Sequence, residues 1–178
     1  RDLLDVARII SGKLTLELVS VNPGDVVRNS VETIKPAAAQ KRIEVATAID
    51  DSARETRIMG DPNRMQQILA NLLTNAVKFT PDGGRIGVSM SVASDRLVIE
   101  VKDSGIGISP EFLPFAFERF RQDRIGTGQA GGLGLGLAIV RYLTEMHNGT
   151  VRVESGGEDA GATFTLEFPV ADMNSTAV

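Results

Sequence analysis

The sequence has 178 residues, a formal net charge of −4 and no cysteine. Its 42% hydrophobic and 24% charged residues are typical of one soluble globular domain, or of one domain with a fragment of another. The acidic balance argues against a nucleic-acid partner, and the lack of cysteine excludes disulfides and thiolate metal sites and fits a cytoplasmic location. No apolar run approaches the roughly 18 residues of a membrane span, so we expect no membrane contact.

The first predicted element is a short helix over residues 2–10, ended by Gly12. Its apolar face carries Leu3, Val6, Ala7 and Ile10. Because so short a helix is not stable alone, we expect it to be the end of a longer helix whose partner lies upstream. The chain begins at Arg1 without Met or a signal-peptide pattern, so we interpret it as a piece of a longer protein.

Alternating apolar residues predict a strand over 14–21, followed by a helix from Pro23 to about Lys41. Pro36 lies inside this helical pattern and is expected to kink it or to mark an irregular turn. Two further strands are predicted over 43–49 and 56–59.

The central element is a helix over 62–80, opened by Asp61-Pro62 and stopped by Pro81-Asp-Gly-Gly84. The helical repeat gives it one broad apolar face, formed by Ile68, Leu69, Leu72, Leu73, Ala76 and Val77. This face predicts that the helix packs along its length against a core.

Three polar residues of this helix, Asn71, Asn75 and Lys78, fall within roughly 60° of one another at the edge of the apolar face. Carboxamide oxygens suit Mg²⁺, and an ammonium group suits phosphate oxygens. The alternative is that the asparagines are ordinary surface residues.

Downstream, alternating residues over 86–92 and 97–101 predict a hairpin, and strands over 150–155 and 161–169 predict another. A helix is expected over 133–146. These elements predict an α+β fold, a two-layer sandwich with a largely antiparallel sheet of five to seven strands and helices on one face.

The connection over 103–132 is long and rich in Gly and Pro, which is typical of a functional or disordered segment. A short amphipathic helix over 110–120 is predicted to interrupt it. Phe115, Phe117 and Phe120 lie there, and the simplest role for them is to hold a lid against the core.

Two glycine-rich motifs border this connection. In Asp103-Ser-Gly-Ile-Gly-Ile108 a carboxylate at a strand end is able to accept a bond from an adenine amine, although Asp-Ser-Gly is also an ordinary turn. Gly131-Gly-Leu-Gly-Leu-Gly-Leu137 leads into a helix, where backbone N–H groups favour an anion; a flexible hinge is the alternative. His147, the only histidine, ends that helix and is expected to be structural.

Four segments in order resemble the motifs of sensor histidine kinases. Asn71-Leu-Leu-Thr-Asn-Ala-Val-Lys-Phe79 is similar to the N box, and Asp103 to Ile108 to the first glycine box. Phe117-Glu-Arg-Phe120 is similar to the F box, and Gly132-Leu-Gly-Leu-Gly-Leu-Ala-Ile-Val140 to the second glycine box. The resemblance covers about residues 14–170 and implies the Bergerat ATP-binding sandwich shared with gyrase, the MutL repair proteins and Hsp90.

The resemblance implies a site for ATP and Mg²⁺. Asn75 would bind the metal, Asn71 and Lys78 the phosphates, and Asp103 the adenine amine. Gly105 and Gly107 would make room for the base, and Thr163 would lie near the adenine-binding Asp. The other residues placed around the nucleotide are Ile108, Phe120, Gly132, Leu133, Gly134, Leu135, Gly136 and Leu137.

Asn71 also separates two activities. The ATPases of this superfamily have a Glu one helical turn before the metal-binding Asn, and an amide is no general base. The resemblance therefore implies a protein histidine kinase, with Asn71 and Lys78 assisting transfer of the γ-phosphoryl group to a histidine. The alternative is a weak GHKL-type ATPase or a degenerate nucleotide-binding regulatory module.

The acceptor histidine is expected upstream of Arg1, so this chain by itself would bind ATP without autophosphorylating. Residues 1–13 would be the end of a dimerisation and phospho-acceptor helix, 14–171 the catalytic domain and 172–178 a frayed tail. The implied partners are ATP and ADP, that upstream domain and a response-regulator receiver domain. Leu133 stands where many relatives have Ser or Thr, so one phosphate contact is expected to be missing.

Overall fold

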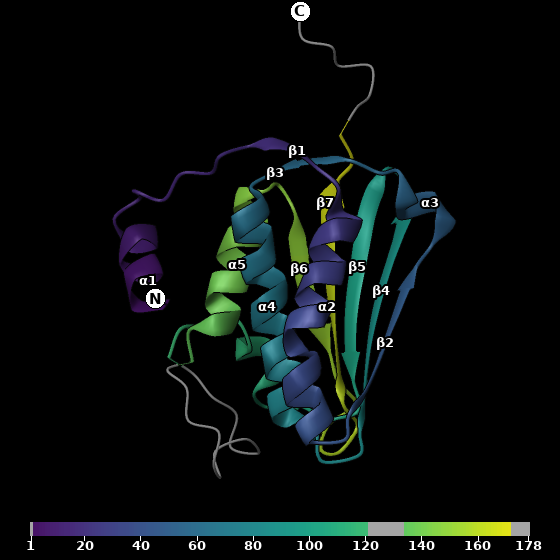
Figure 1. Cartoon of the computed structure of the whole chain (residues 1–178). Coiled ribbons are helices and arrows are strands. Elements are labelled where there is room, and N and C mark those ends of the chain that lie inside the picture. Colours follow the sequence, from purple (N-terminus) through teal and green to yellow (C-terminus); the bar gives the residue numbers. More distant parts are fainter. Residues whose placement is uncertain (1, 121–133, 172–178) are drawn as a thin grey trace, which may run out of the picture.

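A β-sheet and a layer of helices over one of its faces make up the fold (Figure 1). The computed structural model describes residues 2–120 and 134–171. Within these residues the main sheet has five strands in the order β2-β4-β5-β7-β6, where only the β2–β4 pair is parallel. The strands are β2 (Glu44–Ile49), β4 (Arg85–Ala93), β5 (Arg96–Asp103), β6 (Thr150–Glu154) and β7 (Ala162–Pro169). The predicted two-layer α+β sandwich is confirmed.

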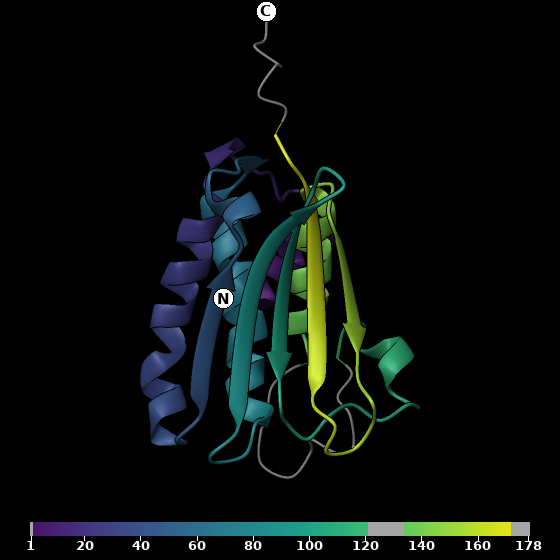
Figure 2. The same cartoon turned by 90° about the vertical axis from the view of Figure 1, so that its right-hand side faces the viewer.

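Three helices cover this sheet: α2 (Pro23–Gln40), α4 (Pro62–Phe79) and α5 (Gly136–Met146). Strand alternation sends every second residue of β4 and β5 into the helical layer, where Met90 and Ile99 are almost completely buried. The other face carries small and polar residues, and Figure 2 shows it uncovered by these helices. The predicted apolar face of α4 is confirmed by its buried residues Met65, Ile68, Leu69, Leu72, Leu73, Ala76 and Val77.

The remaining elements lie around the sandwich. They are α1 (Asp2–Ile10), α3 (Asp51–Arg54), the 3₁₀ helix η1 (Leu113–Phe115) and a two-stranded antiparallel sheet of β1 (Val19–Val21) and β3 (Ile58–Gly60). No helix in the described ranges is long and apolar enough to cross a bilayer.

The helix at the start of the chain is present, but its predicted apolar face is only partly buried. Val6 is buried against the core, whereas Leu3 and Ile10 are 59% and 66% exposed. Asp5 is also buried, and its carboxylate accepts bonds from Arg64 Nη1 (3.1 Å) and Gln67 Nε2 (2.7 Å). Polar contacts with α4 therefore hold α1 as much as apolar packing does.

Two local predictions are corrected. The strand expected over 14–21 is reduced to β1, because its partner β3 is ended by the N-cap of α4. The helix expected over 110–120 is reduced to η1, because Pro114 lacks the N–H that a helix interior needs. The helix predicted from Pro23 to about Lys41 is confirmed, since α2 continues through Pro36 to Gln40.

Candidate functional site

Three segments that are distant in the sequence meet at one end of the sandwich, in the lower part of Figure 1. They are the C-terminal half of α4, the loop after β5 and the start of α5. Asn71 Nδ2 donates a hydrogen bond to Gly136 O (3.2 Å), and Ile106 N–H donates one to Phe79 O (3.0 Å). The helix with the two asparagines is therefore joined directly to both glycine-rich motifs.

The predicted polar residues of α4 lie between its buried face and solvent. Asn71, Asn75 and Lys78 are all half-buried, as their spacing indicates. Across the described ranges, the side chains of Asn75 and Lys78 have no hydrogen-bond or ion-pair partner; Lys78 Nζ lies 5.3 Å from the centroid of the Phe79 ring. Two polar groups with this exposure and no protein partner are suited to a polar ligand.

Asp103, the last residue of β5, is buried with 8% of its surface exposed. Its Oδ1 accepts a bond from Gly105 N–H (2.9 Å). Burial raises the pKa of this carboxyl, and the backbone N–H groups of Gly105 and Ala162 oppose that rise. A carboxyl held in this way has a fixed orientation, as recognition of an amine requires.

The two glycines of the loop after β5 lie too close to neighbouring parts of the chain to carry a side chain. A Cβ at Gly105 would lie 2.5 Å from Phe79 O and 2.7 Å from Asp103 Oδ1. Gly107 has φ +74°, and a Cβ there would lie 1.9 Å from Gly157 O. The absence of a side chain at both positions therefore allows the chain to pack closely on itself. The prediction that these glycines also make room for a nucleotide base is separate from this packing.

The second glycine motif is only partly described, since Gly132 and Leu133 lie outside the described residues. Gly134 has φ +69°, and its carbonyl accepts a bond from Phe120 N–H (3.0 Å). α5 begins at Gly136 without a side-chain cap, so the N–H groups of its first turn are not taken up by a capping side chain. This helix start is chemically suited to an anion.

The apolar residues assigned to the nucleotide differ in exposure. Leu135 is 2% exposed and belongs to the core, so only its backbone is available to a ligand, and Leu137 packs partly against the same core. Ile108 is half-buried, and its N–H donates to Ser155 Oγ (3.0 Å). Phe120 is 63% exposed and has φ 61°.

The structure does not bring Thr163 to Asp103. In the β5–β7 register Ala162 is opposite Asp103, whereas Thr163 is opposite Lys102. Because successive residues of a strand point to opposite faces, the Thr163 side chain lies on the face away from Asp103. We therefore leave Thr163 out of the proposed site; Ala162 occupies the position beside the aspartate.

The polar residues of this site suit a metal ion that is coordinated mainly by the phosphate ligand with which it binds. The described residues contain no group of three or more His, Cys, Asp or Glu side chains that would hold a metal ion by themselves. The Asn75 carboxamide offers one oxygen of the kind that Mg²⁺ prefers. A Mg²⁺ ion at this position would therefore need phosphate oxygens and water for most of its coordination.

His147 lies at the other end of α4 and has a structural role, as predicted. It is buried, its Nε2 accepts a bond from Asp61 N–H (3.1 Å), and its Nδ1 lies 2.6 Å from Leu143 O. Because Nε2 accepts, the proton of the neutral ring is on Nδ1 and is donated to Leu143 O. Its ring also packs edge-on against Phe168 at 6.1 Å.

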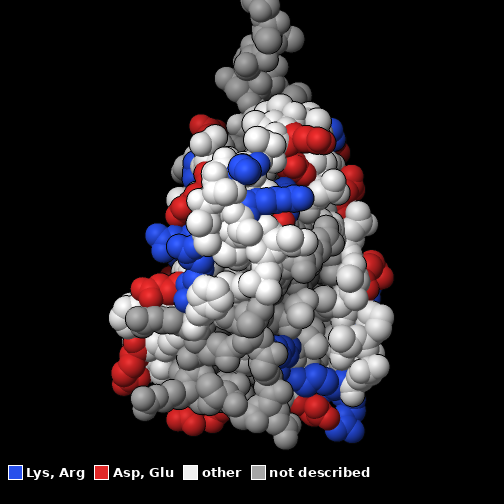
Figure 3. Space-filling model, turned by 90° about the vertical axis from the view of Figure 1, so that its left-hand side faces the viewer, with Lys and Arg blue, Asp and Glu red and all other residues white. Residues whose placement is uncertain are grey.

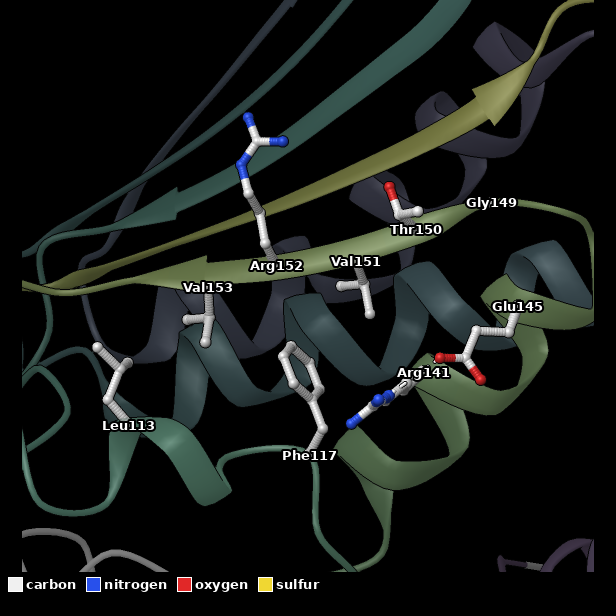
Figure 4. Close-up of a pocket in the computed structure, with 9 residues that line it drawn as sticks. All are labelled: Leu113, Phe117, Arg141, Glu145, Gly149, Thr150, Val151, Arg152 and Val153. Carbon is white, nitrogen blue, oxygen red and sulfur yellow. Dashed lines mark hydrogen bonds and ion pairs between the residues drawn. The ribbon is translucent and has the colours of Figure 1, made fainter.

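Of the three phenylalanines that were expected to hold a lid, Phe117 packs against the core, edge-on to Phe164 at 6.2 Å. It also borders an open cavity of about 400 Å³ between β6 and α5, in which Val151 and Val153 point toward it while Arg152 points away (Figure 4). This cavity is lined by Leu113, Phe117, Arg141, Glu145, Gly149, Thr150, Val151, Arg152 and Val153. None of the predicted nucleotide residues is among them.

Charged residues of both signs are interspersed on the described part of the face seen in Figure 3. Most of the ion pairs are exposed, for example Arg141–Glu145 (3.0 Å) and Arg152–Glu167 (3.2 Å). Such exposed pairs contribute little to stability.

Comparisons with known proteins identify the family of this chain. The family model described as histidine kinase-, DNA gyrase B- and HSP90-like ATPase matches residues 60–172. The sensor-like histidine kinase SenX3 of Mycobacterium tuberculosis is 36% identical over 169 residues, which are 94% of this chain and 40% of SenX3. Hybrid signal transduction histidine kinase D of Dictyostelium discoideum is 33% identical over 98% of this chain and 13% of its own length. The chain thus spans less than half of these relatives.

Two solved structures have the same fold. Full-length ShkA in complex with AMPPNP superposes with a TM-score of 0.82 at 35% identity, over 96% of this chain and 35% of ShkA. The catalytic domain of the histidine kinase ThkA gives 0.76 at 25% identity, over 86% of this chain and 96% of that domain. The chain therefore belongs to the histidine kinase-, DNA gyrase B- and HSP90-like ATPase family, with an ATP-binding catalytic domain of the sensor histidine kinase type.

Proposed function

We propose that the chain binds Mg·ATP between α4, the loop after β5 and the start of α5, and donates the γ-phosphoryl group to a histidine of an upstream domain. The observation that carries this proposal is the contact of Asn71 with Gly136, the first residue of α5. On the same helix as Asn71, the side chains of Asn75 and Lys78 have no hydrogen-bond or ion-pair partner within the described residues. A helix start is suited to phosphate, and two amides and one ammonium on the adjoining helix support binding of a metal-bound triphosphate.

In this proposal Asn75 supplies an oxygen to Mg²⁺, and Lys78 neutralises charge on the phosphates. Asp103 accepts a bond from the adenine amine. The bound Mg²⁺ would draw charge from the phosphate oxygens, which is the main requirement of phosphoryl transfer. ShkA, the similar kinase described above, has been solved in complex with AMPPNP, which supports nucleotide binding by this chain.

Asn71 favours a kinase over an ATPase. It stands one helical turn before Asn75, and its amide donates to Gly136 O instead of acting as a base toward water. The site would then hold ATP with slow hydrolysis and leave the phosphoryl group for an imidazole. Steady phosphate release from the chain alone would favour the ATPase alternative.

The partners follow from this activity. α1 would be the end of a phospho-acceptor helix, and a receiver domain would take the phosphoryl group from the histidine. ThkA, whose fold this chain shares, has been solved in complex with the response regulator protein TrrA. Because ATP is the substrate, we place this reaction in the cytoplasm.

Calorimetric titration with a non-hydrolysable ATP analogue, with and without Mg²⁺, tests the binding step. We expect binding that depends on Mg²⁺, and no binding in either condition would overturn the proposal. Transfer is tested by joining the chain to the phospho-acceptor helices of a related kinase and following labelled phosphate. Acid-labile label on the upstream histidine is expected, whereas label on His147 would contradict the assignment.

A further inference from the structure

The last turn of α4 is joined to other segments of the chain through its carbonyl groups. The Ala76 carbonyl accepts the last regular bond of the helix, and the next three carbonyls, which have no partner inside the helix, accept bonds from outside it. The bonds run from Thr80 N–H to Ala76 O (3.1 Å), from Lys41 Nζ to Val77 O (2.7 Å) and to Lys78 O (3.3 Å), and from Ile106 N–H to Phe79 O (3.0 Å). Lys41 thus supplies two of the three bonds that come from outside the helix.

Lys41 comes from a different helix and is itself held firmly. It is the C-cap of α2, and its backbone N–H donates to Ala38 O (3.1 Å). Its carbonyl accepts a bond from Gly83 N–H (2.8 Å), in the turn that follows α4. With its backbone fixed on both sides and its side chain half-buried, the ammonium group has a defined position under the end of α4.

The charge of Lys41 matters because of where α4 ends. A helix C-terminus carries about half a negative charge, and exposed carbonyls there would repel a triphosphate. Asn75 and Lys78, the proposed metal and phosphate residues, belong to the last turns of this helix. An ammonium group on the Val77 and Lys78 carbonyls both offsets that partial charge and fixes the backbone from which the Lys78 side chain extends.

We propose that Lys41 is a positioning residue for the triphosphate: it acts through the carbonyls of Val77 and Lys78 and has no contact with the nucleotide of its own. This inference depends on the proposed function. It assigns to nucleotide binding a residue outside all four motifs, on a helix that those motifs do not include.

The test compares Lys41→Met, which keeps the length of the side chain without its charge, with Lys41→Arg, which keeps the charge. Dissociation constants are measured for Mg·ATP by calorimetry and for AMP by NMR titration. For Lys41→Met we expect Mg·ATP to bind about tenfold more weakly and AMP to change by less than about twofold, because two charge-assisted bonds at the helix end are lost. Lys41→Arg should restore most of the Mg·ATP affinity.

Lys35→Met is the matched control, since Lys35 is on α2, exposed, and paired only with Glu32. It should bind both nucleotides as the unsubstituted chain does. If Lys41→Met does not fold, Lys41→Gln takes its place, because its amide keeps a donor without the charge. Binding of Mg·ATP by the charge-free variant as tightly as by the unsubstituted chain would overturn the role of Lys41.

Equal weakening of Mg·ATP and AMP would also overturn it, because general loosening of the fold would then be the cause. Hydrogen exchange of the Thr80 and Ile106 amides, measured without nucleotide, should be faster in Lys41→Met if the ammonium holds this end of α4. Failure of the unsubstituted chain to bind Mg·ATP would instead overturn the proposed function, so the two failures are distinguishable.

Discussion

The two ends of α4 differ in how completely their polar side chains are used. At the N-terminal end, Asp61 caps the helix through Asn63 N–H and Arg64 N–H and accepts a third bond from Glu17 N–H (3.1 Å), while its own N–H donates to His147. Toward the C-terminal end, about 20 Å along the helix, Asn75 and Lys78 have no such partner within the described residues.

This difference separates stability from function on a single helix. The N-terminal end is a closed network whose loss would cost folding energy. At the C-terminal end the carbonyls of residues 76–79 all have partners, but the side chains of Asn75 and Lys78 have no hydrogen-bond or ion-pair partner within the described residues, at a cost that a bound ligand would offset. Substitutions at the first end should therefore change unfolding, and substitutions at the second should change binding.

The largest expected effect is on unfolding, from His147→Ala. The change removes a buried ring, leaves Asp61 N–H without the acceptor that His147 supplies and removes the side-chain bond to Leu143 O, so the free energy of unfolding should fall by about 3 kcal/mol. Urea denaturation measures this value. Glu145→Ala, which breaks only an exposed ion pair on α5, is the control and should cost at most about 0.5 kcal/mol. An equally small loss for His147→Ala would show that the network is dispensable.

The second-largest expected effect is on the binding of Mg·ATP, and it comes from Asn75→Asp toward the C-terminal end of α4. A carboxylate in place of the carboxamide brings negative charge to the phosphates and changes the metal ligand, so Mg·ATP should bind about a hundredfold more weakly, or about 2.7 kcal/mol. Calorimetry measures the affinity, and the melting temperature should stay nearly unchanged. Asn63→Asp in the first turn of α4 is the control. Unchanged affinity of Asn75→Asp would contradict the metal assignment.

The contrast between the two ends also shows what sequence alone reveals. The start of α4 at Asp61-Pro62, its apolar face and the β4–β5 hairpin were predictable, because each depends on residues close in the sequence. The Asn71–Gly136 contact was implied only through the family resemblance, since it joins segments 65 residues apart. Nothing in the sequence marked Lys41, whose role depends on how α2 packs beside α4.

Thr163 shows a second limit. The strand over 161–169 was predicted correctly to within a residue, yet the assignment of Thr163 depended on its register with β5. A shift of one residue in a strand moves a side chain to the opposite face, so Ala162 and Thr163 have different surroundings although they are neighbours. Register is set by the pairing of whole strands, and local alternation does not determine it.

Asp103→Asn should have a smaller effect on binding and a specific one. An amide is able to donate as well as accept, so it discriminates less strictly in favour of the adenine amine. We expect the preference for ATP over GTP to fall by about tenfold, or about 1.4 kcal/mol. Competition of both nucleotides against a labelled ATP analogue measures the preference. If the unsubstituted chain binds ATP and GTP equally, Asp103 does not have the proposed role.

The smallest effect is the pH dependence of stability that Asp103 contributes without nucleotide. Because burial raises its pKa above the ordinary value of 3.8, the folded chain holds this proton more tightly than the unfolded chain does. The contribution of Asp103 to stability is therefore fully present below pH 3.8 and is lost as the pH rises through the raised pKa.

The Asn variant lacks this titration, so its stability relative to the unsubstituted chain should increase over that pH interval and then level off. Urea denaturation of both proteins at a series of pH values measures this difference. A relative stability of the variant that decreases as the pH rises would mean that the Gly105 and Ala162 N–H groups outweigh burial, and that this carboxyl is held in its charged form before any nucleotide binds.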